Sequence, residues 1–449
     1  MRKRWIVLGI TMLLSLFILA GCKTTAKDID KWAGGVGGEK LIADAMANPK
    51  LDPPVRVHAM ITLIKIKQSE MMLEKLKKLP DQERMLLIKE SAPEIGKLFQ
   101  TPGLEIQAAA KDALYSFMNL GDKSLQESSA QAILVWYSTN FPTKYSAGRN
   151  SAFNVLSEMG PKAGDLLISL MEKEKSMRIK VARIVEKIND PELIRKTSDL
   201  LITMFNQQVP NPESDLLQVL CFVRDDRLTE LLNRFVADKK IPAQKRSEVF
   251  NTLTYKTSKL TIPVATSIFI DKKEDIDLRG IAIEILEQIG DASLLKYLYP
   301  FLREEDVKWA VFAAILKLGG ANEVENVFNK LDTKVTFWDG DYKVARRHLR
   351  KLDASAAPKL LGYLKSKEVP LVALALLGLQ YTADKDMAEK EIKALAGDKR
   401  EIKNYTQDKP TTIGMLAEEV YSKIVSGAGK TEHEQALQQD AAKKNGPAE

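Results

Sequence analysis

Five residues near the carboxyl end, Gly427-Ala428-Gly429-Lys430-Thr431, have the residue types that a phosphate-binding loop uses. In such a loop, backbone N–H groups and a lysine hold a nucleotide phosphate, and a further glycine stands five residues before the second one. Here that position is Ile424, and the segment follows an expected helix rather than a strand. The sequence therefore argues against a nucleotide site.

The sequence also contains few residues that could bind a metal or act as a nucleophile. Trp338-Asp339-Gly340-Asp341 could supply oxygen ligands, but the D-x-[DN]-x-[DN]-G calcium pattern is absent, so we predict a structural turn. Cys221 falls at a core position, where a thiol packs as a small hydrophobic group. No two of the three histidines have metal-ligand spacing; they are His58, His348 and His433. We therefore predict no catalytic residue, no metal site, no cofactor and no enzymatic activity.

Composition narrows the class of protein. Of the 449 residues, 45% are hydrophobic and 28% are charged, which is typical of a folded chain rather than a disordered one. Lys+Arg number 67 against 60 Asp+Glu, a balance that argues against a nucleic-acid binder. Two cysteines, Cys22 and Cys221, cannot build a disulfide framework.

The amino terminus carries an export signal. The basic start Arg2-Lys3-Arg4 precedes the apolar run Trp5–Ala20, which is too short for a permanent membrane span and fits a signal-peptide core. The run ends in Leu19-Ala20-Gly21-Cys22, which resembles the bacterial lipobox. The resemblance implies that residues 1–21 are cleaved, that Cys22 carries a diacylglycerol and a further acyl chain such as palmitate, and that the chain is a lipoprotein.

The residue after the cysteine is Lys23. In lipoproteins of bacteria with two membranes, Asp at this position favours retention at the inner membrane, so the resemblance implies an outer-membrane lipoprotein that faces the periplasm or the cell surface. Residues 22–38 contain four glycines close together and are expected to form a flexible tether.

From residue 39 onward a helical pattern repeats. Leu278, Ala282 and Leu286 lie on one stripe of a helix, with Arg279 one residue after the first of them and Gly290 at the expected helix end. The same template recurs along the chain at intervals of about 36 residues. An acidic residue stands three positions before the stripe in six copies: Asp52, Glu174, Asp275, Glu304, Asp341 and Glu368. A carboxylate there is expected to stabilise the helix amino terminus.

Second amphipathic segments lie between these helices, and two helices in each period resemble HEAT-type repeats. The resemblance implies an all-α fold, a curved α-solenoid of about ten to eleven helix pairs over residues 39–425, because a lone pair cannot bury its apolar stripe. We expect an extra helix around Gln82–Phe99 and a helix, despite its β-branched residues, over Thr261–Ile270. The polar residues 426–449 are expected to be a disordered tail.

A solenoid of this kind implies a membrane-anchored scaffold or adaptor of the cell envelope that binds a protein partner. Second helices usually line the concave side of HEAT-like solenoids, so we expect contacts from the aromatic residues Tyr297, Tyr299 and Tyr363, and from exposed Trp338. A basic patch of Arg346, Arg347 and Arg350 is either a solvated face or a docking site for an acidic protein or anionic lipid. Basic residues after the first stripe position are expected to pair with acids of neighbouring repeats; they are Arg56, Arg149, Arg178, Arg246, Arg279 and Lys308.

Two other functions stay open. Some HEAT-like proteins resemble bilin lyases, but these act in the cytoplasm, which export argues against. An envelope factor could instead hold a lipid or a glycan in the concave groove. A groove lined by contiguous apolar side chains would favour a lipid or glycan, and a charged groove would favour a protein partner.

Overall fold

The computed structural model describes residues 24–120, 123–256, 258–334, 337–406 and 410–444. These residues are mostly helical, and the only strands among them are the antiparallel pair β1 (Glu401–Ile402) and β2 (Thr411–Thr412). The predicted all-α solenoid fold is thus confirmed. No helix in the described part is long and apolar enough to cross a membrane. The predicted signal peptide, Cys22 and Lys23 lie outside the described residues.

The chain forms two compact units, residues 1–204 and 205–449, with α13 running across the boundary. The helices of the first unit are α2 (Ala26–Ala33), α3 (Gly38–Ala47), α4 (Pro53–Lys65), α5 (Ser69–Lys77), α6 (Asp81–Lys97), α7 (Leu104–Leu120), α8 (Lys123–Tyr137), α9 (Phe141–Lys144), α10 (Ala152–Met159), α11 (Gly164–Lys173), α12 (Arg178–Ile188) and α13 (Pro191–Gln208). Short 3-10 turns, η1 (Leu98–Gln100), η2 (Gly160–Ala163) and η3 (Lys175–Met177), join some of them.

The second unit is the more regular of the two. Its helices are α14 (Ser214–Phe222), α15 (Asp226–Ala237), α16 (Ala243–Thr254), α17 (Ile262–Ile270), α18 (Ile276–Ile289), α19 (Leu295–Leu298), α20 (Lys308–Gly319), α21 (Val324–Lys330), α22 (Asp339–Leu349), α23 (Ala357–Tyr363), α24 (Val369–Thr382), α25 (Lys385–Lys393), α26 (Ile413–Ser426) and α27 (Ala428–Lys444). Its 3-10 turns are η4 (Lys259–Thr261), η5 (Ala292–Leu294), η6 (Tyr299–Arg303), η7 (Gly320–Glu323) and η8 (Ala354–Ala356).

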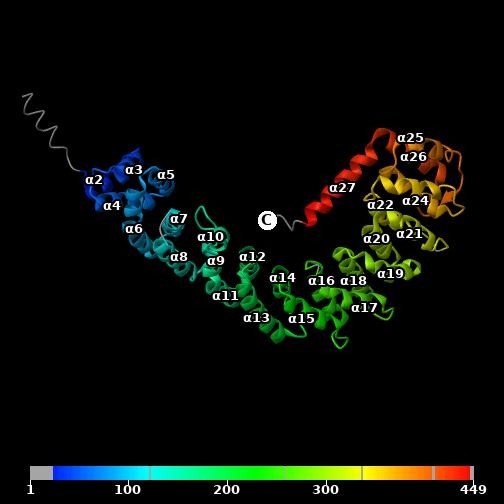
Figure 1. The fold of residues 1–449 in the computed structure, drawn as a ribbon, viewed down its shortest axis with the longest axis horizontal. Helices are drawn as coiled ribbons and strands as arrows, with labels where there is room; N and C mark the ends of the chain where they lie inside the picture. The colour runs from blue at the N-terminus through cyan, green and yellow to red at the C-terminus, as the bar shows by residue number, and fades with distance from the viewer. Residues whose placement is uncertain (1–23, 121–122, 257, 335–336, 407–409, 445–449) are drawn as a thin grey trace, which may run out of the picture. The chain divides into compact units, whose positions relative to one another are not determined.

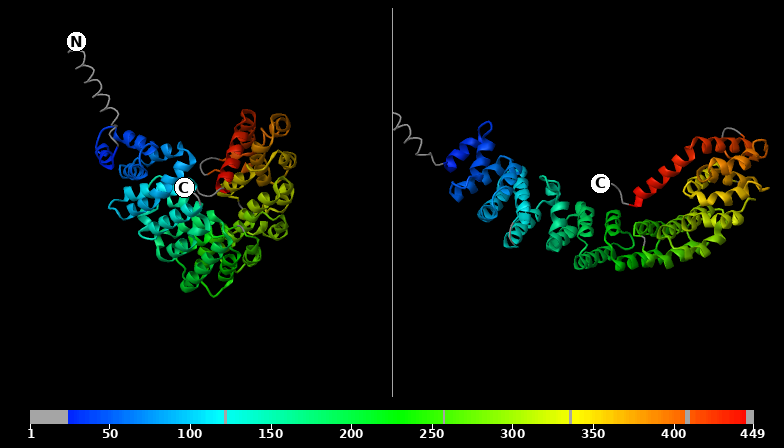
Figure 2. Two further views of the ribbon diagram at one scale, coloured as in Figure 1. Left: turned by 60° about the vertical axis from the view of Figure 1, so that its left-hand side comes forward. Right: turned by 45° about the horizontal axis from the view of Figure 1, so that its top comes forward.

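The second unit stacks its helices in two rows (Figures 1 and 2). The first helices of successive repeats pack side by side in the order α16, α18, α20, α22, α24 and α26. The second helix of each repeat packs on the first helix of the next repeat, as α17 does on α18 and α23 does on α24. Each helix therefore buries its apolar stripe mainly against near neighbours in the sequence, which is the packing of a HEAT-like solenoid.

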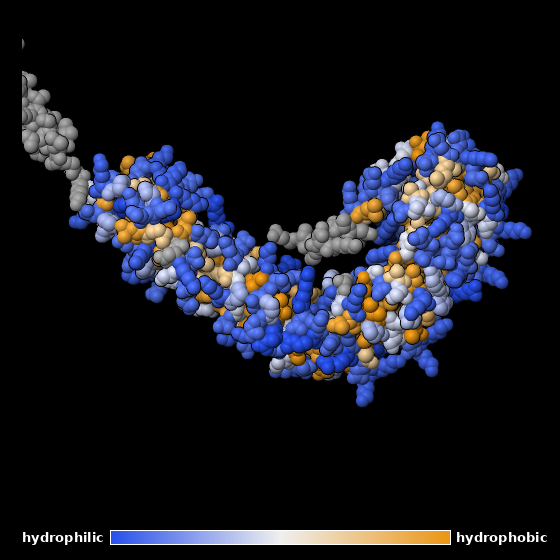
Figure 3. All heavy atoms as spheres, viewed as in Figure 1, coloured by the Kyte–Doolittle hydropathy of each residue, from blue (hydrophilic) through white to orange (hydrophobic). Residues whose placement is uncertain are grey.

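The predicted stripe is the core. Leu278, Ala282 and Leu286 are completely buried, and so are their counterparts Val311 and Ile315 on α20. Alanine at the middle position lets the backbones of neighbouring helices approach closely. Polar and charged residues cover much of the visible face of each unit, and apolar residues show mainly in the seams between helices (Figure 3).

Two further predictions about helices are confirmed. The extra helix near the amino terminus is α6, which spans Asp81–Lys97. The β-branched segment around residue 265 is helical, as η4 and α17. Tertiary packing overrides its strand propensity, because Ala265, Ile268 and Phe269 face the core at helical spacing.

Two expectations about the ends of the chain are wrong. Part of the expected tether is α2, which packs on α3 and α4 and buries Ile29 completely. Most of the expected disordered tail is α27, which packs on α24 and α26. In both segments a few small or apolar residues make the tertiary contact, and composition alone does not show such a contact.

Arginines near the start of the first helices link each repeat to the one before it. Arg246 on α16 donates its Nε–H to the carbonyl of Val236 at 2.6 Å, in the last turn of α15. Arg279 on α18 donates in the same way to Phe269 at 3.0 Å, in the last turn of α17. Two arginines of the first unit repeat this contact, Arg56 with Met46 and Arg178 with Met171. The cation thus sits where carbonyls at a helix carboxyl end lack helical partners.

The other guanidinium nitrogens of these arginines donate to acids that lie further along the chain. Arg246 donates two hydrogen bonds, of 3.0 and 2.8 Å, to Glu274, which lies just before α18. Arg279 donates to Glu304 at 2.6 Å, just before α20, and Arg56 donates to Glu83 at 3.1 Å. These contacts lower the pKa of the Glu274 and Glu304 carboxyls below their usual 4.5. The predicted pairing with acids of neighbouring repeats is confirmed for these three arginines.

The acidic residues before the stripes do not all cap helices as expected. The Asp275 carboxylate accepts hydrogen bonds from the backbone N–H groups of Asp277 and Leu278, which is a direct cap. Glu304 instead pairs with Arg279 of the previous repeat. The longer side chain of glutamate reaches that arginine, so the same sequence position serves two different roles.

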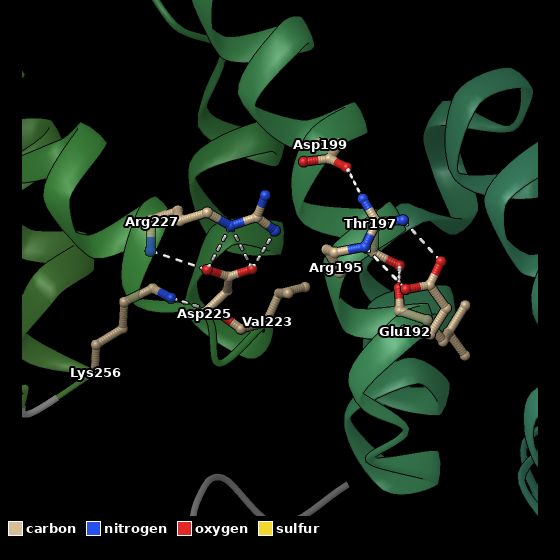
Figure 4. A network of polar contacts seen from close by, with 9 residues as sticks. Glu192, Arg195, Thr197, Asp199, Val223, Asp225, Arg227 and Lys256 are labelled. Atoms are coloured by element: carbon tan, nitrogen blue, oxygen red, sulfur yellow. Dashed lines mark hydrogen bonds and ion pairs between the residues drawn. The ribbon is translucent and has the colours of Figure 1, made fainter.

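Ion pairs between residues close in the sequence provide a contrast (Figure 4). Arg195 on α13 pairs with Glu192 and Asp199 on its own helix, and its side chain is 54% exposed. Arg227 on α15 pairs with Asp225, which caps that helix. Such pairs join residues of one helix and contribute little to stability. The buried arginines join different helices.

Replacing Arg246 by Met keeps an unbranched side chain and removes every guanidinium donor. It leaves the Val236 carbonyl and the Glu274 carboxylate, whose side chain is only 8% exposed, without this partner. We expect a loss of about 3 kcal/mol in the free energy of opening of α16 and α18, measured by hydrogen exchange. Arg227→Met is the control and is expected to lose about 1 kcal/mol or less. Equal losses in the two variants would contradict the role given to the buried link.

Candidate functional site

A groove with a volume of about 930 Å³ lies in the first unit between α5, α7 and the turn before α10. Its floor is formed by Ala108 and Ala109 on α7, and one wall by a stripe of α5 that includes Glu70 and Glu74. The groove exists because α7 presents alanines where a larger side chain would fill the space. It lies on a first helix of the repeat pattern, whereas sequence analysis expected contacts along the second helices.

A buried ion pair fixes the wall opposite α5. Asp112 on α7 is 6% exposed and accepts hydrogen bonds from the backbone N–H groups of Arg149 at 2.7 Å and Asn150 at 3.1 Å. Lys111, which is completely buried, donates to the Asp112 carboxylate at 2.7 Å and to the Asn150 carbonyl. Burial lowers the pKa of the Lys111 ammonium, and the nearby carboxylate opposes that shift. The Asn150 side-chain amide also donates to Asp112, so four hydrogen bonds hold the turn to α7.

Gly148 allows this approach. Its φ of +82° is unfavourable for residues with a side chain, and an added Cβ would lie 2.5 Å from the Asp112 carboxylate oxygen. The repeat pattern in the sequence does not indicate this role of Gly148. The available signal was the charged pair Lys111-Asp112 inside an alanine- and leucine-rich helix, because buried charges are normally paired.

Exposed ion pairs span the groove rim. Arg149 pairs with Glu70 on α5 at 2.8 Å, and both side chains are about two-thirds exposed. Lys67 pairs with Glu105 on α7 in the same way, which lowers the pKa of the Glu105 carboxyl. Exposed pairs of this kind are weak and can exchange one partner for another. The rim thus offers two cations and two carboxylates to a charged ligand.

A second hollow of about 370 Å³ continues from the first and shares Tyr115 and Asn150 with it. It is lined by residues of α10, including Phe153 and Glu158, and by Lys187 of α12. The Tyr115 hydroxyl donates a hydrogen bond to Glu158, which links α7 to α10. Together the two hollows are lined by residues of α7, α10 and α12.

The tyrosines predicted as partner contacts lie on the second-helix row of the second unit. The Tyr299 hydroxyl hydrogen bonds to Glu323, which together with burial raises the pKa of the phenol to about 12. The Tyr363 hydroxyl donates to Asn329 on α21 at 2.8 Å. Both hydroxyls therefore join neighbouring repeats. Tyr297 is 40% exposed, with the Lys296 ammonium over its ring.

The predicted turn residue Trp338 is the N-cap of α22. Its backbone N–H donates to Asp341 at 2.8 Å, so this acid closes a capping interaction as predicted, and the indole is 61% exposed. Of the basic patch, Arg347 is exposed, Arg346 donates to the Tyr405 hydroxyl at 2.8 Å, and the Arg350 carbonyl contacts His433 on α27. Part of the patch is therefore engaged by the protein's own carboxyl-terminal region.

The other residues considered for chemistry are engaged in contacts that hold the fold together. Gly427 ends α26 in the left-handed conformation and Ala428 begins α27, so the glycine-rich segment joins two helices. Burial raises the pKa of the Cys221 thiol to about 11, as expected for a packed cysteine. His58 contacts Asp30 on α2 at 2.7 Å. Among the residues that the structure describes, no group of three or more His, Cys, Asp and Glu side chains could hold a metal ion.

No family model and no curated protein matches the chain. Among solved structures, the chain is similar to Kap121p bound to Nup53p, with 11% identity and a TM-score of 0.41 over 91% of this chain and 52% of that one. Kap121p bound to the SUMO protease Ulp1p gives 11% identity and a TM-score of 0.40 over the same shares. An engineered protein gives 12% identity and a TM-score of 0.25 over 86% of this chain and 98% of that one.

The chain spans about half the length of the Kap121p structures that it matches. The HEAT-like assignment rests on the packing of this chain's own helices.

Proposed function

We propose that the chain is a lipid-anchored, non-enzymatic scaffold of the bacterial cell envelope that binds a protein partner in the groove between α5 and α7. The groove itself carries this proposal. Seven of its fifteen lining residues are charged, and they carry both signs. A surface with alternating charge favours a polypeptide of complementary charge and disfavours a uniformly charged polymer.

The same lining argues against the alternative of a lipid or glycan ligand. Leu73 and the alanines of α7 are the only aliphatic side chains in the groove wall. An acyl chain needs continuous apolar contact, and small-molecule sites are mostly apolar and enclose their ligand. The groove is open and exposes polar and apolar surface in about equal shares, so it suits a protein segment whose side chains can exchange with the rim ion pairs.

The anchor is proposed from the lipobox resemblance at Leu19–Cys22. Two or three acyl chains hold a protein stably at a membrane surface, whereas one does so only marginally. Lys23 favours the outer membrane in a bacterium that has two membranes. The scaffold would then present its groove in the periplasm or at the cell surface.

Cys22→Ser removes the sulfur that carries the diacylglycerol. We expect this variant to lose incorporation of labelled palmitate and to move from the membrane pellet to the soluble fraction. Cys221→Ser is the matched control, since the chain has two cysteines and Cys221 is half-buried on α14, and it is expected to stay in the pellet. A Cys22→Ser protein that still pellets after a salt wash would refute the lipid anchor.

Ala109→Trp fills the groove floor with an indole. We expect proteins captured from membranes by the lipidated chain to bind this variant at least about tenfold more weakly. Val135→Trp is the control, because Val135 lies on α8 and is already 59% exposed, and we expect it to bind like the unmodified chain. Capture of the same proteins at the same strength by both variants would place partner binding elsewhere, provided that both melt at the unmodified temperature.

A further inference from the structure

Helix α27 folds back over the second unit instead of extending its row of first helices. After Gly427, which adopts a φ of +73°, the chain reverses, and α27, red in Figures 1 and 2, runs away from α26. Gly429 meets Gln380 on α24, Glu432 accepts a hydrogen bond from Tyr381 of the same helix, and His433 reaches Arg350 at the end of α22. The contacts thus pass back along the row from α26 to α24 to α22.

The close fit depends on small residues. A Cβ on Gly429 would lie 1.8 Å from the backbone oxygen of Gln380, so no other residue can occupy this position with α27 in place. Seven residues later, on the same face of the helix, Ala436 is 2% exposed. Between them lie Glu432 and His433. Along the contact stripe of α27, a small residue is therefore followed by an acid and a histidine, and then by a second small residue.

The face beneath α27 is basic and polar. Arg346 is bonded to the Tyr405 hydroxyl, and the Tyr381 hydroxyl donates to Glu432 at 3.1 Å. His433 Nδ1 lies 2.5 Å from the Arg350 carbonyl oxygen and so donates its hydrogen to that atom. A carboxylate near Arg346 and Arg350 complements their charge. The face selects a helix that brings an acidic side chain to this place.

Two residues that α27 contacts have buried side-chain polar atoms without a hydrogen-bond partner. Gln380 is 1% exposed, and neither its amide nitrogen nor its amide oxygen has a hydrogen-bond partner in the structure. The buried Nε of Arg350 is also without a partner. Buried polar groups are normally satisfied, so α22 and α24 leave hydrogen bonds unmade at residues that α27 contacts through their backbone. Few apolar atoms of α27 offset the cost of these unmade hydrogen bonds, since its buried contact residues are glycine and alanine.

We propose that the face of α22 and α24 beneath α27 is a docking site for a helical segment of a partner protein, and that α27 is a removable cover of that site. The partner helix has small residues seven positions apart, with a carboxylate between them that accepts from the Tyr381 hydroxyl. The single residue Gly427 joins α26 to α27, so the cover swings away about one hinge. The site lies in the second unit and is distinct from the groove of the first unit.

The test uses the full chain and a labelled synthetic peptide with the sequence of residues 428–444 as the probe. Gly429→Leu expels α27 by collision with the Gln380 carbonyl and leaves the face beneath it unchanged. Gly397→Leu is the matched control, because an added Cβ there meets no atom within 4 Å. We expect the peptide to bind the Gly429→Leu chain at least tenfold more tightly than the unmodified chain or the Gly397→Leu chain. A peptide that itself carries Leu at position 429 is expected not to bind.

Equal binding of the peptide to all three chains, or binding to none, would overturn the proposal. Hydrogen exchange separates a cover from a structural part of the stack. We expect faster exchange in Gly429→Leu to be confined to α27 and to the facing residues of α22 and α24. Faster exchange throughout the second unit would mean that α27 is needed for the fold, and this result would also overturn the proposal.

Discussion

The structure depends on a buried contact between successive repeats: an arginine near the start of each of several first helices donates to a last-turn carbonyl of the helix before it. Helix ends leave carbonyls without helical partners, and a stack of short helices has many such ends. Arg246 and Arg279 satisfy a carbonyl behind them and then hold the carboxylate of Glu274 or Glu304 ahead of them. Burial of the apolar stripe stabilises the helix pairs, and the arginine links fix the position of one helix pair on the next.

The fold was predictable because its signal repeats. Leu278, Ala282 and Leu286 set a period that every copy reinforces, so errors at single positions did not matter. The arginine after the stripe was visible as well, and its pairing with a neighbouring acid followed from charge. Its backbone acceptor was not visible, since every residue has a carbonyl and only the three-dimensional position of a helix end selects Val236 or Phe269. Helix α27 was missed because one glycine and one alanine make its buried contacts, and a polar helix with so small a stripe looks like a tail.

The groove shows the same limit of prediction from the sequence. Its floor is defined by what is missing, the side chains beyond Cβ at Ala108 and Ala109, and its wall depends on contacts between residues nearly forty positions apart, Asp112 with Arg149 and Asn150. Predicted contact residues such as Tyr299 and Tyr363 were chosen because exposed aromatics anchor interfaces, yet their hydroxyls join neighbouring repeats. In a solenoid every surface residue has a neighbour from the next repeat, so residue type alone does not separate a partner contact from an internal one.

The most direct test of the interlocking links is the acid dependence of hydrogen-exchange protection in α18 and α20. Because Arg279 lowers the pKa of Glu304 in the folded chain, the link stabilises the fold above the unfolded value of about 4.5 and is lost as pH falls through the folded value. From about pH 6 to about pH 3.5, the unmodified chain and Glu305→Gln should lose protection together. Glu304→Gln should be less protected at pH 6 and lose less on acidification. If Glu304→Gln matches the unmodified chain at every pH, the buried arginine links do not hold the stack together.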